Sequence, residues 1–236
     1  MRPASLLAAC ALLGSGVGAA SAAEGTPEVK VTGIRNPQMR AYRSVAAGLD
    51  AFDRHRTLAP AVAAPRFRFI LQPGIDDGSS EPLALRIAGQ GVAIPVPIGN
   101  ERDFTVPRSA AAYDDDADLV LNRKNGLYRP IVLVRSPGLA PNVMRLGDVR
   151  MECQVTIAIV KKELPLLALA AINSLMLTGD WCNKHKFNFS VHTDTAPNKA
   201  TLVWGERRQN VPVEGHSLAA PIGEHEWPDD ALIELE

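Results

Sequence analysis

The sequence predicts a β-rich α+β protein, with an antiparallel, sandwich-like body, an N-terminal amphipathic helix and one buried helix. Three patterns predict this class. Apolar residues recur at helical spacing in one early segment, they alternate with polar residues in most segments after residue 66, and one apolar run lies near residue 170. Period-two segments separated by Gly, Pro and Asn are typical of antiparallel strands joined by turns.

The first 22 residues have the features of a signal peptide. Arg2 gives a basic start, an apolar run extends from Leu6 to Leu13, and Ala20-Ser21-Ala22 has the small residues that signal peptidase prefers. We expect cleavage after Ala22, so that the mature chain is periplasmic or secreted. The alternative is a lipoprotein anchored at Cys10, because Leu7-Ala8-Ala9-Cys10 also fits a lipid-attachment motif.

The mature chain is close to neutral. Arg2 is the only charged residue that leaves with the leader, so 24 of the 25 basic residues and all 26 acidic residues remain. This balance gives no indication of a nucleic-acid partner. The longest apolar stretch, Leu164–Leu177, is shorter than the ~20 residues that cross a bilayer. We therefore expect no transmembrane segment in the mature chain.

We divide the chain into a signal peptide (1–22), an N-terminal segment (23–65) and a β-rich domain (66–236). The N-terminal segment begins with a predicted strand, Val29–Ile34. A helix is predicted over Pro37–His55, because Asn36 can cap it, Pro37 suits its first position, and its apolar residues recur every three or four positions. Residues 57–65, rich in Ala and Pro, form the predicted connector.

Alternating apolar residues predict the strands of the β-rich domain. Pro95 and Pro97 cannot donate to a ladder, so their strand is expected at a sheet edge or in a polyproline-like run. Residues 83–135 are interpreted, on architectural analogy alone, as a small Ig-like or transthyretin-like sandwich. The predicted strands are Phe67–Leu71, Leu83–Ile87, Val92–Ile98, Phe104–Val106, Asp118–Asn122, Leu127–Val134, Lys186–Val191, Ala200–Trp204 and Ala231–Leu235.

Two strands of this set are predicted to form a hairpin. Asp118–Asn122 and Leu127–Val134 flank Asn125-Gly126, the dipeptide best suited to the positive φ angles of a tight hairpin turn. We therefore expect these strands to pair with each other.

The clearest alternation runs from Asp148 to Val160, where every odd position from Val149 to Ile159 is apolar or cysteine. A period of two predicts a long strand with one buried face, which includes Cys153. The apolar run Leu164–Leu177 that follows predicts a buried helix, which ends at Thr178-Gly179.

Outside the leader the chain has two cysteines, Cys153 and Cys182. In a protein of an oxidising compartment we expect them to form a disulfide. The alternative is two separate buried thiols.

The densest alternation of charge comprises Arg145, Asp148, Arg150 and Glu152. On a strand, the last three would share one face about 7 Å apart. We interpret the run as a candidate polar binding face, with a solvated face of cross-strand ion pairs as the alternative.

Templates for metal and catalytic sites are incomplete. The acidic run Asp114–Asp118 begins like a calcium loop, but Leu119 occupies the position that needs Gly and Asn125 the position that needs Glu. The five histidines lack the spacing of a zinc site, and there is no G-x-S-x-G elbow or glycine-rich phosphate loop. We expect no metal, no cofactor and no catalytic residue.

These observations lead to two functional hypotheses. The first is a non-catalytic binding or structural module of the cell envelope, which offers a sheet face or edge to an unknown envelope protein or peptide. The second is a hydrolase or metal-dependent enzyme whose site is assembled only in the fold. A concave pocket that holds two or more convergent titratable groups with strongly shifted pKa values would favour the second.

Overall fold

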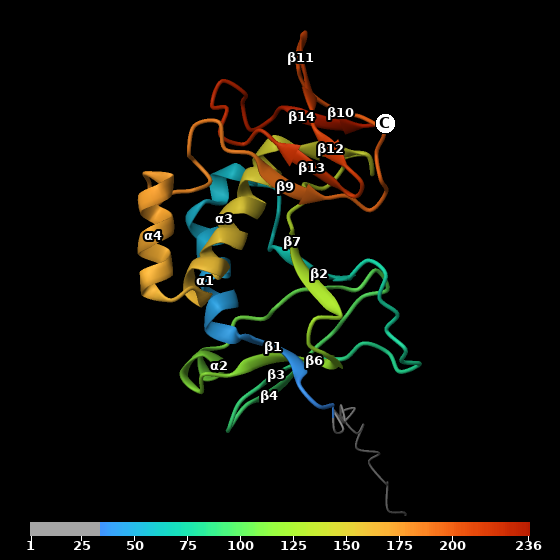
Figure 1. The fold of residues 1–236 in the computed structure, drawn as a ribbon, viewed down its shortest axis with the longest axis vertical. Helices are drawn as coiled ribbons and strands as arrows, with labels where there is room; N and C mark the ends of the chain where they lie inside the picture. The colour runs from blue at the N-terminus through green and yellow to red at the C-terminus, as the bar shows by residue number, and fades with distance from the viewer. Residues whose placement is uncertain (1–33) are drawn as a thin grey trace, which may run out of the picture. The chain divides into compact units, whose positions relative to one another are not determined.

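The structure is a computed structural model that describes residues 34–236 (Figure 1). The described chain is mixed α+β and β-rich, with several antiparallel sheets, as the sequence predicts. Its helices are α1 (Tyr42–Arg54), α2 (Ala110–Asp114), α3 (Leu146–Glu163) and α4 (Leu166–Met176), with a 3-10 turn at Arg56–Leu58. The predicted signal peptide, Cys10 and the predicted strand Val29–Ile34, except its last residue, lie outside the described residues.

Two sheets form around the first hydrophobic core. One has the order β1 (Pro37–Ala41), β6 (Asp118–Lys124), β3 (Leu85–Ala88), β4 (Ala93–Val96). The other has the order β5 (Asp103–Phe104), β2 (Arg66–Leu71), β7 (Tyr128–Leu133). In the described part of the chain strand β4 pairs only with β3, so Pro95 lies at a sheet edge there, as predicted. The strands of residues 83–135 divide between these sheets and share them with β1 and β2.

Two further sheets enclose a second core, toward the C-terminus. One has the order β11 (Arg207–Val211), β10 (Ala200–Trp204), β14 (Leu232–Leu235), β8 (Val143–Arg145). The other has the order β12 (Val213–Glu214), β13 (Ser217–Ala220), β9 (Phe189–His192). The predicted bounds Ala200–Trp204 are confirmed for β10, whereas β8, β11, β12 and β13 have no counterpart in the prediction.

The prediction of a long strand at Asp148–Val160 was wrong, because this segment belongs to helix α3. Val149 and Cys153 pack into the second core, while Met151, Val155 and Ile159 pack into the first. Each set follows the four-residue spacing of a helix face. Because two residues advance a helix by about 200°, stripes offset by two positions lie on opposite sides. A helix buried on both sides therefore shows apolar residues at every odd position.

Helix α1 packs closely on α3 where Gly48 meets Ile159. A Cβ at position 48 would lie 2.6 Å from Ile159 Cγ1, which is closer than side chains pack. The predicted start of this helix was wrong, since residues 37–41 form strand β1 and α1 begins at Tyr42. Pairing of β1 with β6 takes precedence over the Asn-Pro cap, and Asn36 adopts a positive φ of 58°.

The predicted hairpin was also wrong. The two strands form as β6 and β7, but β6 pairs with β1 and β3, while β7 pairs with β2. The turn itself is present, because Leu127 N donates to Lys124 O and Gly126 has a φ of 89°. A single positive φ at the third turn residue suits a type II turn, which splays the two strands instead of matching their twist.

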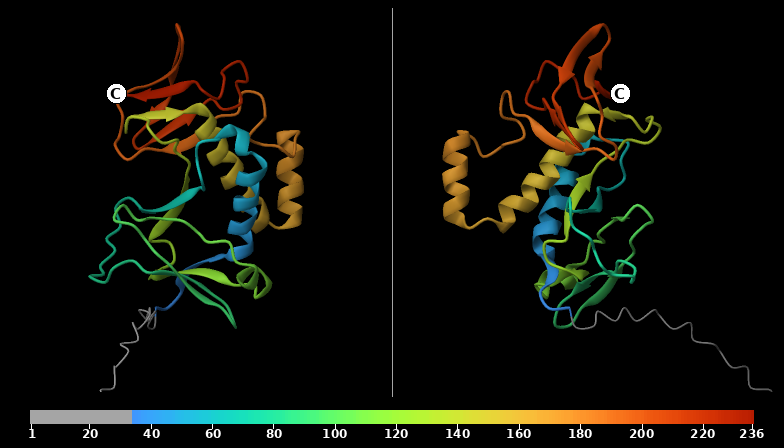
Figure 2. Two further views of the ribbon diagram at one scale, coloured as in Figure 1. Left: turned by 180° about the vertical axis from the view of Figure 1, so that it is seen from behind. Right: turned by 45° about the vertical axis from the view of Figure 1, so that its right-hand side comes forward.

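The apolar run after α3 forms helix α4, but α4 is not buried as predicted. None of its residues is buried, and Leu166, Leu167 and Leu175 are each more than 80 % exposed. Figures 1 and 2 show α4 standing to one side of α1 and α3. Within residues 34–236, no helix is both long and apolar enough to cross a membrane.

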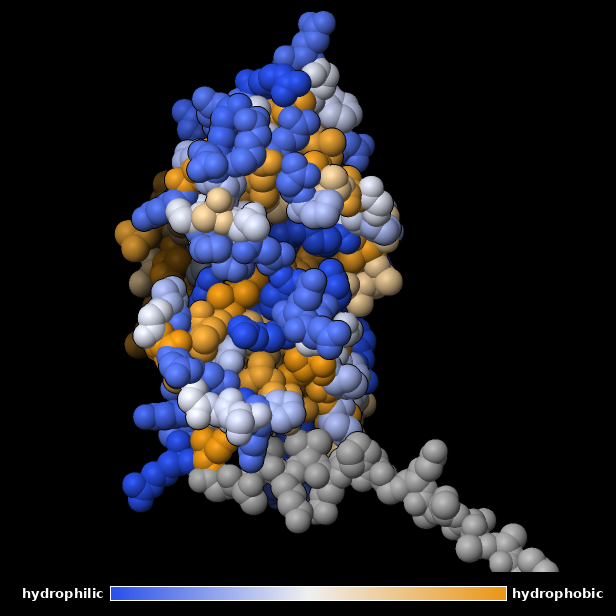
Figure 3. Space-filling view, turned by 90° about the vertical axis from the view of Figure 1, so that its right-hand side faces the viewer, coloured by the Kyte–Doolittle hydropathy of each residue, from blue (hydrophilic) through white to orange (hydrophobic). Residues whose placement is uncertain are grey.

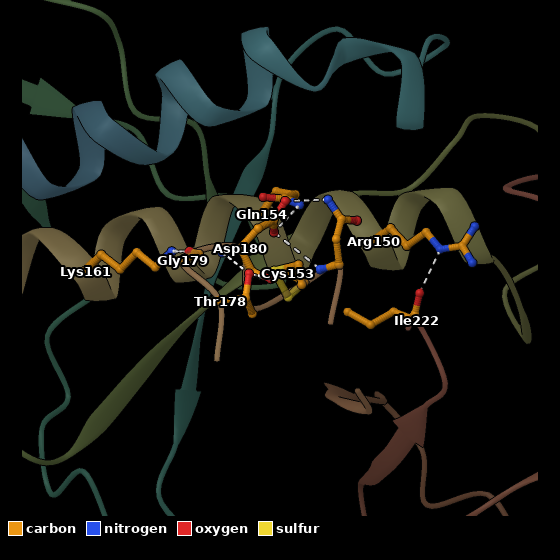
Figure 4. The surroundings of a disulfide bond; sticks show 10 residues. Arg150, Cys153, Gln154, Lys161, Thr178, Gly179, Asp180 and Ile222 are labelled. Carbon is orange, nitrogen blue, oxygen red and sulfur yellow. Dashed lines mark hydrogen bonds between the residues drawn. A yellow bond between two sulfur atoms is a disulfide. The ribbon is translucent and has the colours of Figure 1, made fainter. Parts of the chain in front are cut away.

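The predicted disulfide is present: Cys153 and Cys182 are bonded and both are buried. Cys153 lies on α3, not on a strand, and Cys182 follows the return from α4. Figure 4 shows Thr178, Gly179 and Asp180 lying along α3 beside the disulfide. The bond therefore fixes the segment that follows α4 against α3, the helix that both cores share.

Candidate functional site

The candidate site is a groove between two strands that each form the edge of a sheet. Among the described residues, strand β7 pairs only with β2, and β9 pairs only with β13. Both strands line one groove of about 290 Å³, together with helix α3, Arg40 on β1 and Phe67 on β2. We call this the β7–β9 groove. Its lining comprises Arg40, Phe67, Arg129, Pro130, Ile131, Val132, Glu152, Thr156, Ile159, Val160, Phe189, Ser190, Val191 and His192.

The register of β7 identifies the main-chain groups at its free edge. Gln72 N donates to Leu127 O, so odd-numbered residues of β7 bond to β2 in the alternating pattern of an antiparallel pair. The even-numbered residues Tyr128, Pro130 and Val132 therefore direct their main-chain groups away from β2, and the last two of them line the groove. Val134, the next residue of this series, donates its N–H to Glu152 Oε1 on α3 at 2.8 Å. Pro130 has no N–H, so it offers only its carbonyl.

The same reasoning applies to β9. Thr193 N donates to His216 O, so Thr193 and Val191 direct their main-chain groups toward β13. Ser190 and His192, which alternate with them, direct theirs toward the open side. The groove thus offers the N–H and C=O groups of three residues and one further carbonyl.

A larger cleft of about 830 Å³ adjoins the groove, and Arg129 and His192 line both. In the cleft, the buried guanidinium of Arg68 donates to Asp194 at 2.5 Å and to Glu101 at 2.6 Å. Its Nε has no hydrogen-bond partner. On the face shown in Figure 3, hydrophobic patches (orange) lie open between strongly hydrophilic side chains (blue).

The cleft favours a negatively charged group. Arg68 is compensated by the two carboxylates, whereas Arg129 and Arg102 line the cleft without an ion pair among the described residues. Unpaired guanidinium groups are strong and often bidentate donors to carboxylates. Arg102 stacks on the Tyr128 ring at 5.8 Å, which holds its side chain at the cleft wall.

Two histidines stack in this cleft. The rings of His192 and His216 are 5.9 Å apart, and His216 Nδ1 donates to Thr193 O at 3.1 Å, because that carbonyl can only accept. Burial, followed by the charge of Arg129, lowers the pKa of His192, while Asp194 opposes this shift. His192 is therefore uncharged at neutral pH.

Of the predicted polar face, only Glu152 lines the groove, and the four residues do not share one face. Arg145 precedes α3, and the other three lie on the helix, where Asp148 and Glu152 are buried. Arg145 pairs with Asp230 at 2.7 Å and Arg150 with Asp229 at 2.6 Å.

The two buried carboxylates of this run bind the segment after β7. Asp148 accepts from Ser136 N at 2.6 Å and from Ser136 Oγ at 2.8 Å. Glu152 pairs with Arg135 and accepts from Val134 N. Burial raises the pKa of Glu152. These contacts fix α3 against its neighbours, and a binding role for Arg145, Asp148, Arg150 and Glu152 stays a prediction.

Sequence reasoning did not single out Arg68, Arg129, Ser190 or His192. Pro130, which interrupts a predicted strand, was the available sign of a sheet edge. Within residues 34–236 no three His, Cys, Asp or Glu side chains are grouped to hold a metal ion. No family model, curated protein or solved structure matches the chain.

Proposed function

We propose that the chain is a non-catalytic binding module of the cell envelope, which holds an extended segment of a partner protein in the β7–β9 groove. The observation that carries this proposal is that two strand edges, unpaired within residues 34–236, border the same groove. An added strand gains affinity from main-chain hydrogen bonds and specificity from pockets for alternate side chains. Soluble proteins usually cover or blunt such edges, so two open edges facing one groove favour a ligand there.

The lining of the groove supports a particular ligand chemistry. Phe67, Ile159 and Phe189 provide an apolar wall for one set of alternate side chains. Where the groove meets the cleft, Arg129 is available to a carboxylate. We therefore propose an extended segment with alternating apolar residues and an acidic residue, or a terminal carboxylate, that reaches Arg129.

The proposed compartment is the periplasm or the exterior. The disulfide is compatible with an oxidising compartment, and Ala20-Ser21-Ala22 supports cleavage of the leader after Ala22. The intact mass of the exported protein tests this directly. A lipid-modified N-terminus at Cys10 would support the lipoprotein alternative.

The groove is tested with peptides selected from a displayed library on the purified chain. N-methylation removes a peptide N–H without changing the protein. If the peptide pairs with both edges, methylating either set of alternate residues lowers affinity, because one set of N–H groups bonds to β7 and the other to β9. Unchanged affinity after methylation of each set would contradict strand addition.

The acidic preference is tested with Arg129→Glu. A charge-assisted hydrogen bond contributes about 1.5–3 kcal/mol, so affinity for an acidic peptide should fall roughly 10- to 100-fold. Arg208→Glu, on the exposed β10–β11 hairpin, is the matched control. Equal affinities of the two variants would contradict the role of Arg129.

A second candidate function is a hydrolase centred on Ser217. Ser217 lies directly opposite His192, both line the cleft, and the lowered pKa of His192 suits a general base. No hydrogen bond joins their side chains within the described part of the chain, so the binding module is preferred. Covalent labelling of Ser217 by a fluorophosphonate, absent in Ser217→Ala, would favour the hydrolase.

A further inference from the structure

Helix α4 has an exposed face that is apolar, the reverse of an ordinary surface helix. Leu166, Leu167 and Leu175 are 84, 87 and 81 % exposed, and Leu177, directly after the helix, is 89 % exposed. Ala170 and Ala171 lie between them and are also exposed. We call these six residues the α4 face.

The opposite side of α4 holds the contacts to the protein. Asn173 Oδ1 accepts from Trp181 Nε1 at 2.8 Å, and Met176 Sδ lies 3.8 Å from Lys184 Nζ. Trp181 is buried and Lys161 stacks on its ring at 4.8 Å. The α4 face therefore points away from every contact that fixes the helix.

The α4 stretch is uncharged and is flanked in sequence by lysines. Residues 164–179 contain no charged side chain, Lys161 and Lys162 precede them, and Lys184 and Lys186 follow. Lys162 and Lys186 are exposed, whereas Lys161 and Lys184 contact Trp181 and Met176 on the opposite side of the helix. Of the two acidic residues nearby, Glu163 pairs with Arg40 at 3.0 Å, and Asp180 bonds to Asn183 at 2.5 Å. An uncharged apolar face with basic flanks complements a surface that is apolar inside and anionic at its rim.

The size of the α4 face argues against a second copy as its occupant. The four leucines present on the order of 400 Å² of apolar surface at roughly 100 Å² each. A stable interface buries about 800 Å² per partner. The area that each copy of the α4 face could bury in a dimer is therefore too small. A bilayer sets no such minimum, because affinity there grows with each buried side chain and with attraction to anionic lipids.

We propose that the α4 face inserts into the interfacial region of a membrane with anionic headgroups. The helix has 11 residues and is ~16 Å long, about half the thickness of the hydrocarbon core. It therefore lies along the surface, with its leucines at the boundary of headgroups and acyl chains and the flanking, exposed Lys162 and Lys186 at the phosphates. This proposal is independent of the β7–β9 groove.

The test is flotation of the full exported chain with vesicles. One set contains phosphatidylcholine alone, and the other contains one part phosphatidylglycerol to three parts phosphatidylcholine. We expect binding to the anionic set that weakens as salt is raised. The affinity of the double variant Leu167→Gln, Leu175→Gln for the anionic vesicles should be lower than that of the parent chain by roughly tenfold or more. Ile75→Gln, at another exposed aliphatic residue, should bind as the parent chain does.

Because Leu167 and Leu175 are exposed, the double variant should keep the melting temperature of the parent chain, which separates lost binding from lost folding. Absence of flotation, or equal flotation of the parent and the double variant, would overturn the proposal. Equal binding to both vesicle sets would overturn the anionic preference. A dimer in sedimentation that the double variant abolishes, without flotation, would assign the face to a second copy.

Discussion

The Cys153–Cys182 disulfide closes a loop that contains the second half of α3 and all of α4. Replacing both cysteines by Ala opens this loop in the unfolded chain and removes one tie between α3 and the segment after α4. We expect the variant to fold, because α3 remains packed in both cores, but to be less stable.

The magnitude follows from the sequence separation of 29 residues. In the chain-entropy treatment, closing a loop of this length is worth about 3.5 kcal/mol at 25 °C. For a chain of this size 1 kcal/mol corresponds to roughly 2–4 °C. Calorimetry should therefore show a melting temperature roughly 7–14 °C below that of the parent chain.

Reduction of the parent chain provides the control, since it opens the loop without removing any atom from the core. The reduced parent and the double Ala variant should melt within a few degrees of each other. If the free energy of unfolding fell by less than about 1 kcal/mol both on reduction and in the double Ala variant, the loop argument would be contradicted. Two free thiols in the native, non-reduced protein would contradict the bond itself.

Three further predictions concern buried and half-buried positions. Burial lowers the pKa of His192 in the folded state, so the unfolded state binds the proton more tightly. The stability that depends on this histidine is therefore present above pH ~6.5 and is lost as the pH falls below that value. In denaturant titrations His192→Gln should flatten this pH dependence, whereas His185→Gln should not. Glu152→Ala leaves Arg135 and Val134 N without their acceptor and should cost about 3–5 kcal/mol in free energy of unfolding; a cost below 1 kcal/mol would show that water replaces the carboxylate. Gly48→Ala should cost about 1–3 kcal/mol, because Ile159 has to move, and an unchanged denaturation midpoint would refute the close packing of α1 on α3.

Local patterns predicted much of the secondary structure, and they failed where an element is buried in an unusual way. The alternation over residues 148–160 has a period of two in sequence, yet it arises from two helical stripes on α3. Periodicity identifies a helix only if one side faces water, since the polar side supplies the contrast. Asp148 and Glu152 gave no such contrast, because both are buried in hydrogen bonds.

Helix α4 shows the opposite limit. Its apolar composition predicted a helix, and the helix forms, but the same composition predicted burial within the chain. Composition gives the free energy gained when a side chain leaves water, but it does not identify the surface that buries that side chain. An exposed apolar helix is therefore visible only in the fold.

The groove lay beyond sequence reasoning because strand patterns do not specify strand neighbours. Asn125-Gly126 predicted a turn correctly, but the partners of β6 and β7 depend on strands from elsewhere in the chain. Likewise, nothing in residues 189–192 indicates that the open side of β9 borders β7. The two edges meet because both sheets pack on α3, which was itself predicted to be a strand.

The geometry of α3 also limits what the groove can hold. Glu152 on this helix already binds Val134, so the outward main-chain groups of β7 end at Val132, and Pro130 provides no donor. On the other edge, only Ser190 and His192 face outward within β9. Main-chain bonding can thus engage a segment of only about four or five residues, given a strand rise of ~3.3 Å per residue. Since so few main-chain hydrogen bonds are available, most of the selectivity must come from the apolar wall and from Arg129. The charge reversal at Arg129 should therefore lower the affinity more than the loss of any single main-chain hydrogen bond.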